Sequence, residues 1–366
     1  MKVKVGAPDL VLMGVTLALV AIGVVMVFSA SSVTASLRFE DAYYFAKRQT
    51  LWLVPSLLAL LVLTFVPFHH WQRLAVPAMG LAVVFLVLVL FAAEVKGSSR
   101  WLVVGPLRFS PAEMTKLCLV LFLARALSRD PTRLRSFFGG LAPYLLLVGL
   151  VCGLIMAQPD LGTTMVVGGT AMAMLMMAGA SWWHLSGLLV AATGLVAAAI
   201  YYEPYRFNRF LAFLDPWKYP DTWGFQTIQS LYALGSGGWL GVGLGCSLQK
   251  YFYLPEQHTD FIFAILGEEL GLVGCGTVIA LFVVFAVRGF RVALRAPSLF
   301  GSLLAAGITC AVVLQAIINI GVVSGALPVT GIPLPFISYG GSSLLFTMAG
   351  VGLVLNVSRY RVVKDE

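Results

Sequence analysis

The sequence predicts an all-α polytopic membrane protein, and three features of its composition support this fold class. Of the 366 residues, 60% are hydrophobic and only 11% are charged, and the mean hydropathy is +0.93. Soluble domains carry about 25% charged residues, so this chain cannot cover a water-facing surface of its size. The apolar residues form continuous runs without the alternation of a β-barrel, which favours helices. Soluble enzymes and nucleic-acid-binding proteins are excluded, although the net charge is +8.

The apolar runs divide the chain into spans. A helix needs about 20 apolar residues to cross the hydrocarbon core of a bilayer. Ten runs of this kind occur, at residues 8–29, 49–67, 75–93, 111–128, 140–158, 161–180, 183–202, 260–288, 299–325 and 337–357. Short cytoplasmic loops are enriched in Lys and Arg, and the loops 125–135 and 288–295 show this enrichment. We therefore expect ten transmembrane helices with both termini in the cytoplasm.

The bases on the opposite side need a separate explanation. Thirteen of the twenty-four bases fall on the cytoplasmic side of this topology, which leaves eleven where few are expected. These eleven are Arg38, Lys47, Arg48, Lys96, Arg100, Arg108, Lys116, Arg206, Arg209, Lys218 and Lys250. An anionic ligand held at the outer face would account for them.

We interpret the whole chain (1–366) as a single transmembrane domain, in which one connection is long. Residues 203–259 form an extracytoplasmic loop between the seventh and eighth spans, and loops of this length are usually functional. Residues 206–217 and 226–234 have the pattern of short interfacial helices. The glycines of 235–245 allow tight folding or close approach to a ligand. The loop could lie on the bilayer surface or close over a lipid-facing cavity.

Ionisable residues open the predicted fourth span. Residues 110–113 (SPAE) have the pattern of a capping box, in which Ser110 caps the helix and Glu113 reaches back, so a structural role leads for Glu113. Lys116 lies one turn deeper on the same face, where no cap requires it. It could pair with Glu113, or it could join Arg108 in binding a pyrophosphate at the helix N-terminus.

Two further charged residues lie at the outer ends of spans. Asp160 stands between two apolar spans with almost no loop, and an N-cap of the sixth span is its simple interpretation. Arg48 opens the second span beside Lys47, where interfacial snorkelling and ligand contact are equally good explanations.

Asp260 is the most informative acid, because it stands at the head of the eighth span beside the long loop. N-capping would explain one Asp there, but it does not explain why Glu256 and His258 stand close by. A carboxylate at a half-dry mouth can have a raised pKa and serve as a general base. Glu268 and Glu269 lie two turns deeper, where they could pair with a Lys or Arg from a neighbouring span or line the cavity. For both we favour a structural role.

Three segments carry a resemblance to a known family. Residues 158–163 (QPDLGT), 254–264 (LPEQHTDFIFA) and 328–343 (PVTGIPLPFISYGGSS) resemble the signatures of SEDS proteins (shape, elongation, division and sporulation). Residues 215–217 (DPW) and 229–238 (QSLYALGSGG) are more similar to the division (FtsW) and sporulation (SpoVE) branch than to the elongation (RodA) branch.

This resemblance implies a ten-span peptidoglycan glycosyltransferase in the bacterial cytoplasmic membrane. Such an enzyme polymerises lipid II at the outer face of that membrane during cell division or sporulation. The implied partners are lipid II, a class B penicillin-binding protein, other divisome proteins and membrane lipids, and no nucleic acid. The resemblance makes Asp260 the catalytic residue. The residues expected to bind substrate are Arg48, Arg108, Glu113, Lys116, Asp160, Glu256 and His258.

Joined to the charge pattern, the resemblance gives a mechanistic hypothesis. Asp260 takes the proton of an acceptor hydroxyl, and Arg48, Arg108 and Lys116 neutralise the departing undecaprenyl pyrophosphate. A divalent cation such as Mg²⁺ or Mn²⁺ could assist them, and no organic cofactor is expected. A lipid II flippase is the alternative, because it would use the same outer cations. A catalytically silent scaffold for the transpeptidase would be expected only if Asp260 were replaced.

Overall fold

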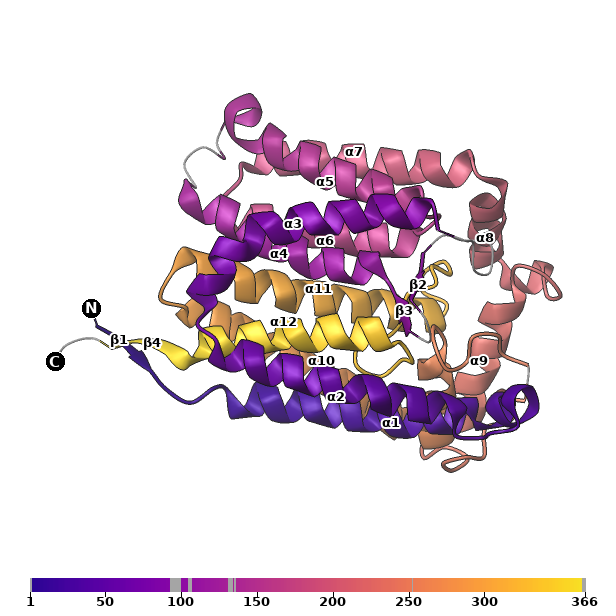
Figure 1. The fold of residues 1–366 in the computed structure, drawn as a ribbon. Coiled ribbons are helices and arrows are strands. Elements are labelled where there is room, and N and C mark those ends of the chain that lie inside the picture. Colours follow the sequence, from indigo (N-terminus) through magenta and orange to yellow (C-terminus); the bar gives the residue numbers. More distant parts are fainter. Residues whose placement is uncertain are drawn as a thin grey trace.

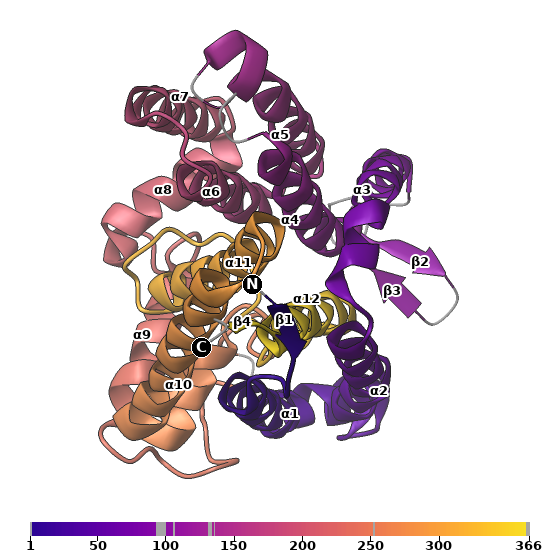
Figure 2. The same cartoon turned by 90° about the vertical axis from the view of Figure 1, so that its left-hand side faces the viewer.

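The fold is a bundle of long helices with two short helices across one end (Figures 1 and 2). The computed structural model describes residues 2–92, 100–104, 107–130, 134, 136–251 and 253–363, and Lys96 lies outside these ranges. The bundle helices are α1 (Leu10–Phe39), α2 (Tyr44–Phe65), α3 (Phe68–Leu90), α4 (Pro111–Arg129), α5 (Ala142–Met156), α6 (Leu161–Met177), α7 (Trp182–Tyr201), α10 (Ile262–Arg295), α11 (Leu299–Val323) and α12 (Gly341–Arg359).

These ten helices coincide with the ten predicted spans, so the expected fold class is confirmed. Within the described residues, eight helical stretches are long and apolar enough to cross a membrane, one of them being Phe137–Met156, which joins a π-helical turn (Phe137–Leu141) to α5. The other two are α6, which has 17 residues, and α4, whose first turns carry Glu113 and Lys116. Helix α4 is therefore long enough to span the membrane but is less apolar than the other spans because of its charges.

Shorter elements close the two ends of the bundle. The strands β1 (Lys2–Val5) and β4 (Tyr360–Val363) pair antiparallel, which brings both termini to one end (Figure 1). We assign this end to the cytoplasm. At the opposite, outer end lie the hairpin β2 (Leu102–Val104) and β3 (Leu107–Phe109), the helices α8 (Pro204–Leu214) and α9 (Phe225–Gly237), and a 3-10 turn (Pro216–Lys218). Helices α8 and α9 stand where the interfacial helices were predicted.

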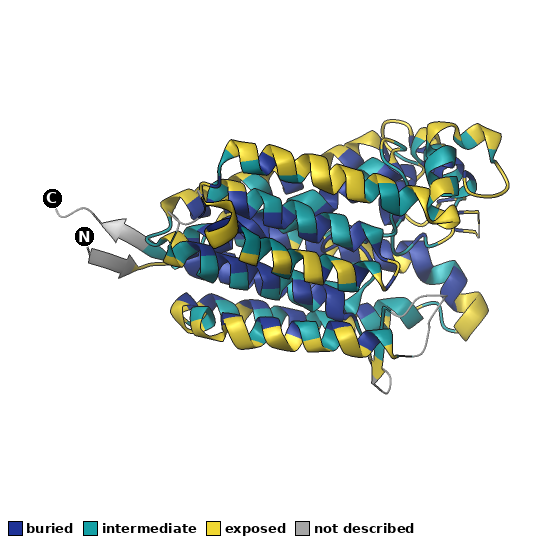
Figure 3. Cartoon of the chain, turned by 90° about the horizontal axis from the view of Figure 1, so that it is seen from above, coloured by how far each residue is buried: buried dark blue, intermediate teal, exposed yellow. Residues whose placement is uncertain are grey.

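The core runs along the centre of the bundle (Figure 3). Of the apolar stretches, 72% of that in α12 and 67% of that in α11 is buried, against 6% in α7. Helix α7 therefore turns most of its surface outward to lipid. Close approach at the centre requires small residues, and Gly352 of α12 packs against the main-chain carbonyl of Leu60 in α2.

Helix α10 is interrupted near its outer end. At 1.5 Å per residue its 34 residues would extend about 51 Å, more than the roughly 30 Å of a hydrocarbon core. The helix breaks at Gly271, whose backbone has φ 65° and ψ −164°. The stretch from Leu272 to Arg295 is about 36 Å long and crosses the membrane alone. The stretch from Ile262 to Glu269 is completely buried in protein and leads up to Asp260.

The glycine-rich end of the long loop fills this break. The N–H groups of Val242 and Gly243 donate to the carbonyls of Glu268 and Glu269 at 2.9 and 3.1 Å. In return, the N–H groups of Leu272 and Val273 donate to the carbonyls of Gly238 and Trp239 at 2.9 and 3.1 Å. The main-chain groups that the break frees are thereby satisfied, as a lipid environment demands.

Gly237 is one of the glycines that make this contact possible, and Gly237→Ala should destabilise the protein. A Cβ at this position would lie 2.0 Å from the carbonyl oxygen of Gly267, which is backbone and cannot move aside cheaply. Overpacking of this kind costs about 1–3 kcal/mol, so the thermal unfolding midpoint should fall by several degrees. Gly235→Ala in the same helix is the matched control, because nothing lies within 4 Å of its added carbon. Equal midpoints for the two variants would contradict this account of the break.

Candidate active site

Asp260 stands in a turn between the long loop and α10. Within this turn, the Thr259 hydroxyl donates to the Glu256 carboxylate at 3.0 Å, and the Phe261 N–H donates to the Glu256 carbonyl at 3.3 Å. Glu256 adopts a left-handed backbone with φ 55°. Few non-glycine residues do so without support from their surroundings. The turn is therefore held by its own hydrogen bonds as well as by its neighbours.

The connection between α11 and α12 braces this turn. The Ser338 hydroxyl donates to the Thr259 carbonyl at 2.6 Å, and the Tyr339 N–H donates to the His258 carbonyl at 2.9 Å. The sequence segments 254–264 and 328–343, far apart in the chain, thus lie against each other.

Asn319 of α11 hydrogen-bonds to both of these segments. Its Nδ2 donates to the main-chain carbonyls of Asp260 and Ile332, both at 2.8 Å. Gly331 has φ 72°, and a Cβ there would lie 3.5 Å from Asp260 Oδ2, so the half-buried carboxylate faces this glycine. The backbone on both sides of the Asp260 carboxylate is therefore fixed.

Asp160 is close enough for its charge to act on Asp260, and hydrogen bonds fix its own carboxylate. Its carboxylate accepts from the Thr163 N–H and the Thr163 hydroxyl, both at 2.9 Å, so the expected N-cap of α6 forms. Arg100 Nη1 lies 3.6 Å from Asp160 Oδ2, and the same guanidinium donates to the carbonyls of Gln158 and Pro159. Arg100 thereby links the β2 segment to the start of α6.

A second arginine approaches from α8. Arg209 Nη1 donates to the Val329 carbonyl at 3.4 Å, and its guanidinium lies 4.5 Å from the Tyr205 ring centroid. Among the described residues, the charges of Arg100 and Arg209 lower the pKa of the Asp260 carboxyl. Positive charge that acts on this acid therefore comes from the segment before β2 and from the interfacial helix α8.

The surroundings of Asp260 favour its protonated form. Burial, together with the negative charges of Glu256 and Asp160, raises the pKa of Asp260 to about 7. Arg100 and Arg209 act in the opposite direction and limit it. A carboxyl group with a pKa near neutrality can both take and return a proton at physiological pH.

Glu113 and Lys116 form an ion pair in place of the expected capping box. The Ser110 side chain makes no capping hydrogen bond, and its N–H donates to the Ser342 hydroxyl at 3.4 Å. Glu113 turns to Lys116 Nζ, at 2.9 Å from one carboxylate oxygen and 3.0 Å from the other. The capping-box prediction was wrong because a full positive charge one turn away attracts the carboxylate more strongly than a backbone N–H does.

Lys116 also reaches α11, which connects it to the Asp260 turn. Lys116 Nζ donates to Gln315 Oε1 at 2.6 Å, and Gln315 Nε2 donates to the Pro333 carbonyl at 2.8 Å. Gln315 stands one helical turn from Asn319, so both amides hold the 331–338 connection. Among the described residues, no ion pair joins Lys116 directly to Asp260.

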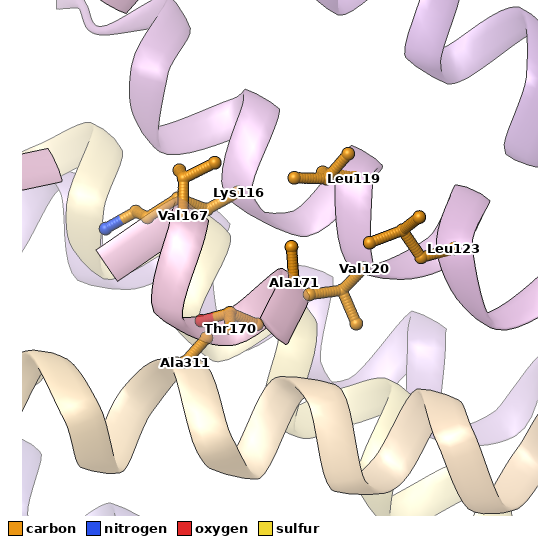
Figure 4. Close-up of a pocket in the computed structure, with 8 residues that line it drawn as sticks. All are labelled: Lys116, Leu119, Val120, Leu123, Val167, Thr170, Ala171 and Ala311. Atoms are coloured by element: carbon orange, nitrogen blue, oxygen red, sulfur yellow. The ribbon is translucent and has the colours of Figure 1, made fainter. Parts of the chain in front are cut away.

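Two cavities flank Lys116. One is a narrow cavity that has the Glu113–Lys116 pair and Gln315 among otherwise mostly apolar residues of α4, α11 and α12. The other is smaller and lies between α4, α6 and α11 (Figure 4). In Figure 4 the Lys116 ammonium group points away from Leu119 and Leu123. A charged group at one end of an apolar opening suits a lipid with an anionic head group.

Arg48 and Arg108 gather at Tyr339 and do not touch Asp260. The Arg48 guanidinium lies 4.7 Å from the Tyr44 ring centroid, and its charge acts on Tyr339. Burial raises the pKa of Tyr339, and the charges of Arg48 and Arg108 oppose the rise. Arg108 is exposed on β3 opposite Val103.

His258 connects this second group of cations to the turn. Its ring lies 4.4 Å from the Phe45 ring and 5.6 Å from the Tyr339 ring, measured between centroids. The predicted residues therefore fall into three adjoining groups, around Asp260, Lys116 and Tyr339. The sequence alone did not single out Arg100, Arg209, Gln315, Asn319 or Tyr339. For Arg100 and Arg209 the only signal in the sequence was that they are two of the eleven bases on the outer side.

The sequence is similar to known bacterial proteins over nearly its whole length. A family described as cell cycle proteins, FtsW/RodA/SpoVE, matches residues 9–362. The chain belongs to this family. It is 46% identical to stage V sporulation protein E of Bacillus subtilis (strain 168) over 364 residues, which cover 98% of this chain and 99% of that protein. It is 42% identical to a probable peptidoglycan glycosyltransferase FtsW of Geobacter metallireducens, covering 96% of this chain and 94% of that protein.

Solved structures of the FtsW/RodA/SpoVE family share the whole fold. A chain from a peptidoglycan synthase complex that coordinates polymerization and crosslinking superposes with a TM-score of 0.80 at 36% identity, covering 96% of this chain and 98% of that one. Thermus thermophilus rod shape determining protein RodA superposes with a TM-score of 0.72 at 33% identity, covering 96% and 97%. The predicted family is confirmed, and the chain is a multi-pass protein of the bacterial cytoplasmic membrane.

Proposed function

We propose that this protein is a peptidoglycan glycosyltransferase that polymerises lipid II into β-1,4-linked glycan strands at the outer face of the membrane. The observation that carries the proposal is the position of Asp260. A carboxyl group with a pKa of about 7 stands at the outer end of the bundle, within the fields of Arg100 and Arg209. The relatives named as probable peptidoglycan glycosyltransferases are similar over nearly their whole length.

The chemistry follows from this arrangement. Asp260, as general base, takes the proton of the 4-hydroxyl of an acceptor N-acetylglucosamine, and the oxygen attacks C1 of the donor N-acetylmuramic acid. The bond from C1 to the pyrophosphate breaks, so the configuration at C1 inverts and undecaprenyl pyrophosphate leaves. General-base catalysis contributes about 10²–10⁴-fold.

Basic side chains at the outer mouth stabilise the departing pyrophosphate. They form the three groups described above, with Arg100 and Arg209 beside Asp260, Lys116 at the apolar opening, and Arg48 and Arg108 at Tyr339. Guanidinium groups suit phosphates because they donate two parallel hydrogen bonds. Each predicted substrate-binding residue, Asp160, Glu113, Glu256 and His258 included, belongs to or adjoins one of these groups.

A divalent cation remains an expectation from the resemblance. Within the described parts of the chain, no three His, Cys, Asp or Glu side chains come together in a metal-binding cluster. Mg²⁺ often relies on one or two carboxylates and on substrate phosphates, so Asp260 could contribute one ligand when lipid II is bound. In this mechanism the basic side chains neutralise the negative charge of the pyrophosphate.

The reaction should be pH-dependent because the base must be unprotonated. The pKa of Asp260 is raised to about 7, so the carboxyl is largely protonated below this pH and ionised above it. We therefore expect kcat to rise about tenfold per pH unit well below pH 7 and to level off above it. Initial rates of polymer formation at saturating lipid II, measured across this range in one buffer system, check the midpoint. A rate that stays flat from pH 5 to pH 8 would contradict the assignment.

A lipid II flippase is the second candidate, and the distribution of charges argues against it. A flippase needs polar residues along a path to the inner leaflet. Helix α11 carries no acid or base, and α12 carries none before Arg359 at its end. Helix α4 carries none between Lys116 and Arg125. The ionisable residues inside α4 and the buried start of α10, which are Glu113, Lys116, Glu268 and Glu269, lie instead toward the outer end, where a chemical step would occur.

The test is to reconstitute the purified protein in liposomes with lipid II and to resolve products on a gel. A ladder of strands that a muramidase digests is expected, stronger when a class B penicillin-binding protein is added. That partner is proposed because the solved relative works in a complex that coordinates polymerization and crosslinking. Transfer of lipid II between leaflets without any polymer, with and without the partner, would favour the flippase.

A further inference from the structure

A buried ion pair joins the long loop to the broken end of α10. Lys250 Nζ lies 3.1 Å from Glu269 Oε1, and the two side chains are 3% and 0% exposed. The Ser29 hydroxyl of α1 lies 2.7 and 2.6 Å from the two oxygens of the same carboxylate. Lys250 Nζ also donates to the Gly245 carbonyl. The pair is therefore enclosed by α1, α10 and the loop, and both of its charged groups have further hydrogen-bond partners.

Glu268 binds the neighbouring part of the loop in the same way. Its carboxylate accepts from the Leu248 N–H at 2.9 Å, from the Gln249 N–H at 3.4 Å and from the Ser247 hydroxyl. The two glutamates were predicted to be structural and either to pair with a Lys or Arg of a neighbouring span or to line the cavity. Glu269 does pair with a base, but Lys250 belongs to the loop, and Glu268 binds N–H and hydroxyl groups of the loop instead. Their ligands, however, all belong to the segment that leads into the Asp260 turn or to α1.

A short chain of contacts links the ion pair to Asp260. The Lys250 carbonyl accepts from Gln257 Nε2 at 3.2 Å, and the same nitrogen donates to the Thr34 hydroxyl of α1 at 2.7 Å. Gln257 is three residues before Asp260. On the other side, the buried helical stretch from Ile262 to Glu269 connects the pair to Asp260 through rigid backbone. The pair thus holds the Asp260 turn from both of its ends.

Stability alone gives no reason for an ion pair here. Burying two charges costs several kcal/mol, and well-packed apolar residues of similar volume are often as stable or more stable. What a charged, hydrogen-bonded pair adds is a single defined geometry. The Asp260 carboxylate needs such a geometry, because a displacement of about 1 Å can reduce a rate about 100-fold.

We propose that Lys250 and Glu269 are positioning residues, whose buried ion pair fixes the turn that carries the Asp260 carboxylate. The inference rests on the proposed polymerase function and deepens it. Neither residue contacts the reacting groups. Their removal should therefore change turnover and the environment of Asp260 rather than the binding of lipid II.

The test is the double variant Lys250→Met/Glu269→Gln, which removes both charges and leaves none unpaired. For protein that remains folded by thermal unfolding, we expect kcat for polymerisation to fall about 10–100-fold while KM changes less than about threefold. The acid limb of the pH–rate profile should move by about half a unit or more, because Asp260 shifts relative to Arg100 and Arg209. The control is Asp9→Asn/Arg288→Met, which removes an ion pair of 2.7 Å at the cytoplasmic end of α10.

Ser29→Ala provides a milder second variant should the double variant not fold. It removes the hydroxyl that holds both Glu269 oxygens without unbalancing any charge, and a loss of about three- to tenfold in kcat is expected. Folded variants with parental kcat and a parental acid limb would overturn the proposal, as would a rise in KM at unchanged kcat. If the parent itself makes no polymer, the proposed function fails instead, so the two failures are distinguishable.

Discussion

Asp260→Asn should reduce the rate of glycan synthesis by about 10²–10⁴-fold, the contribution of a general base. Asparagine has nearly the same shape but cannot take the proton of the acceptor hydroxyl. The fold should survive, because the contact that anchors this residue is made by its main-chain carbonyl with Asn319 at 2.8 Å. The measurement is the initial rate of lipid II polymerisation by purified protein, with thermal unfolding recorded on the same sample.

The matched control is Asp221→Asn, which removes an exposed acid in the same extracytoplasmic loop. Its rate should stay within about twofold of the parent, because surface substitutions rarely have larger effects. Polymerisation by Asp260→Asn protein at the control's rate would remove Asp260 from the mechanism.

Lys116→Met should have the second largest effect, on both stability and activity. The replacement leaves the Glu113 carboxylate buried without its cation, since the two side chains are 11% and 9% exposed. Breaking a buried pair from one side costs about 3–5 kcal/mol. The loss of positive charge at the apolar opening should also weaken the hold on the pyrophosphate and raise KM about tenfold.

The double variant Glu113→Gln/Lys116→Met separates these two effects. It should recover most of the stability, because no unpaired charge remains, while KM stays high. Lys47→Met is the control, because the Lys47–Asp41 pair of 2.8 Å is exposed and worth little. Full recovery of KM in the double variant would show that Lys116 serves the fold alone.

The spans could be predicted because continuous apolar runs have few alternatives in a bilayer. The same reasoning placed Asp160 and Asp260 correctly at the outer ends of helices. It did not predict the break in α10. Gly271 stands within an apolar run, and a single glycine there is compatible with an unbroken helix. The break depends on a partner from the distant loop around Gly241, which local sequence does not reveal.

The grouping of the site residues could not be predicted for a related reason. Arg48, Arg108 and Lys116 were expected to face the pyrophosphate that departs at Asp260, yet the arginines whose charges act on this acid are Arg100 and Arg209. Arg100 belongs to a hairpin segment and Arg209 to an interfacial helix, so their positions depend on how these pieces pack against the bundle. The glycines near 241 were thought to approach a ligand or to fold tightly. They approach the backbone of α10.

The most direct test of the account compares binding with turnover in one preparation of Asp260→Asn protein. The account assigns the chemical step to this carboxylate and the pyrophosphate to the surrounding bases. It therefore predicts that polymerisation is lost while the Kd for undecaprenyl pyrophosphate, measured by intrinsic fluorescence or calorimetry, stays within about threefold of the parental value or becomes tighter. A Kd that weakens in parallel with the rate would show that Asp260 holds the lipid rather than the proton, and would contradict the account.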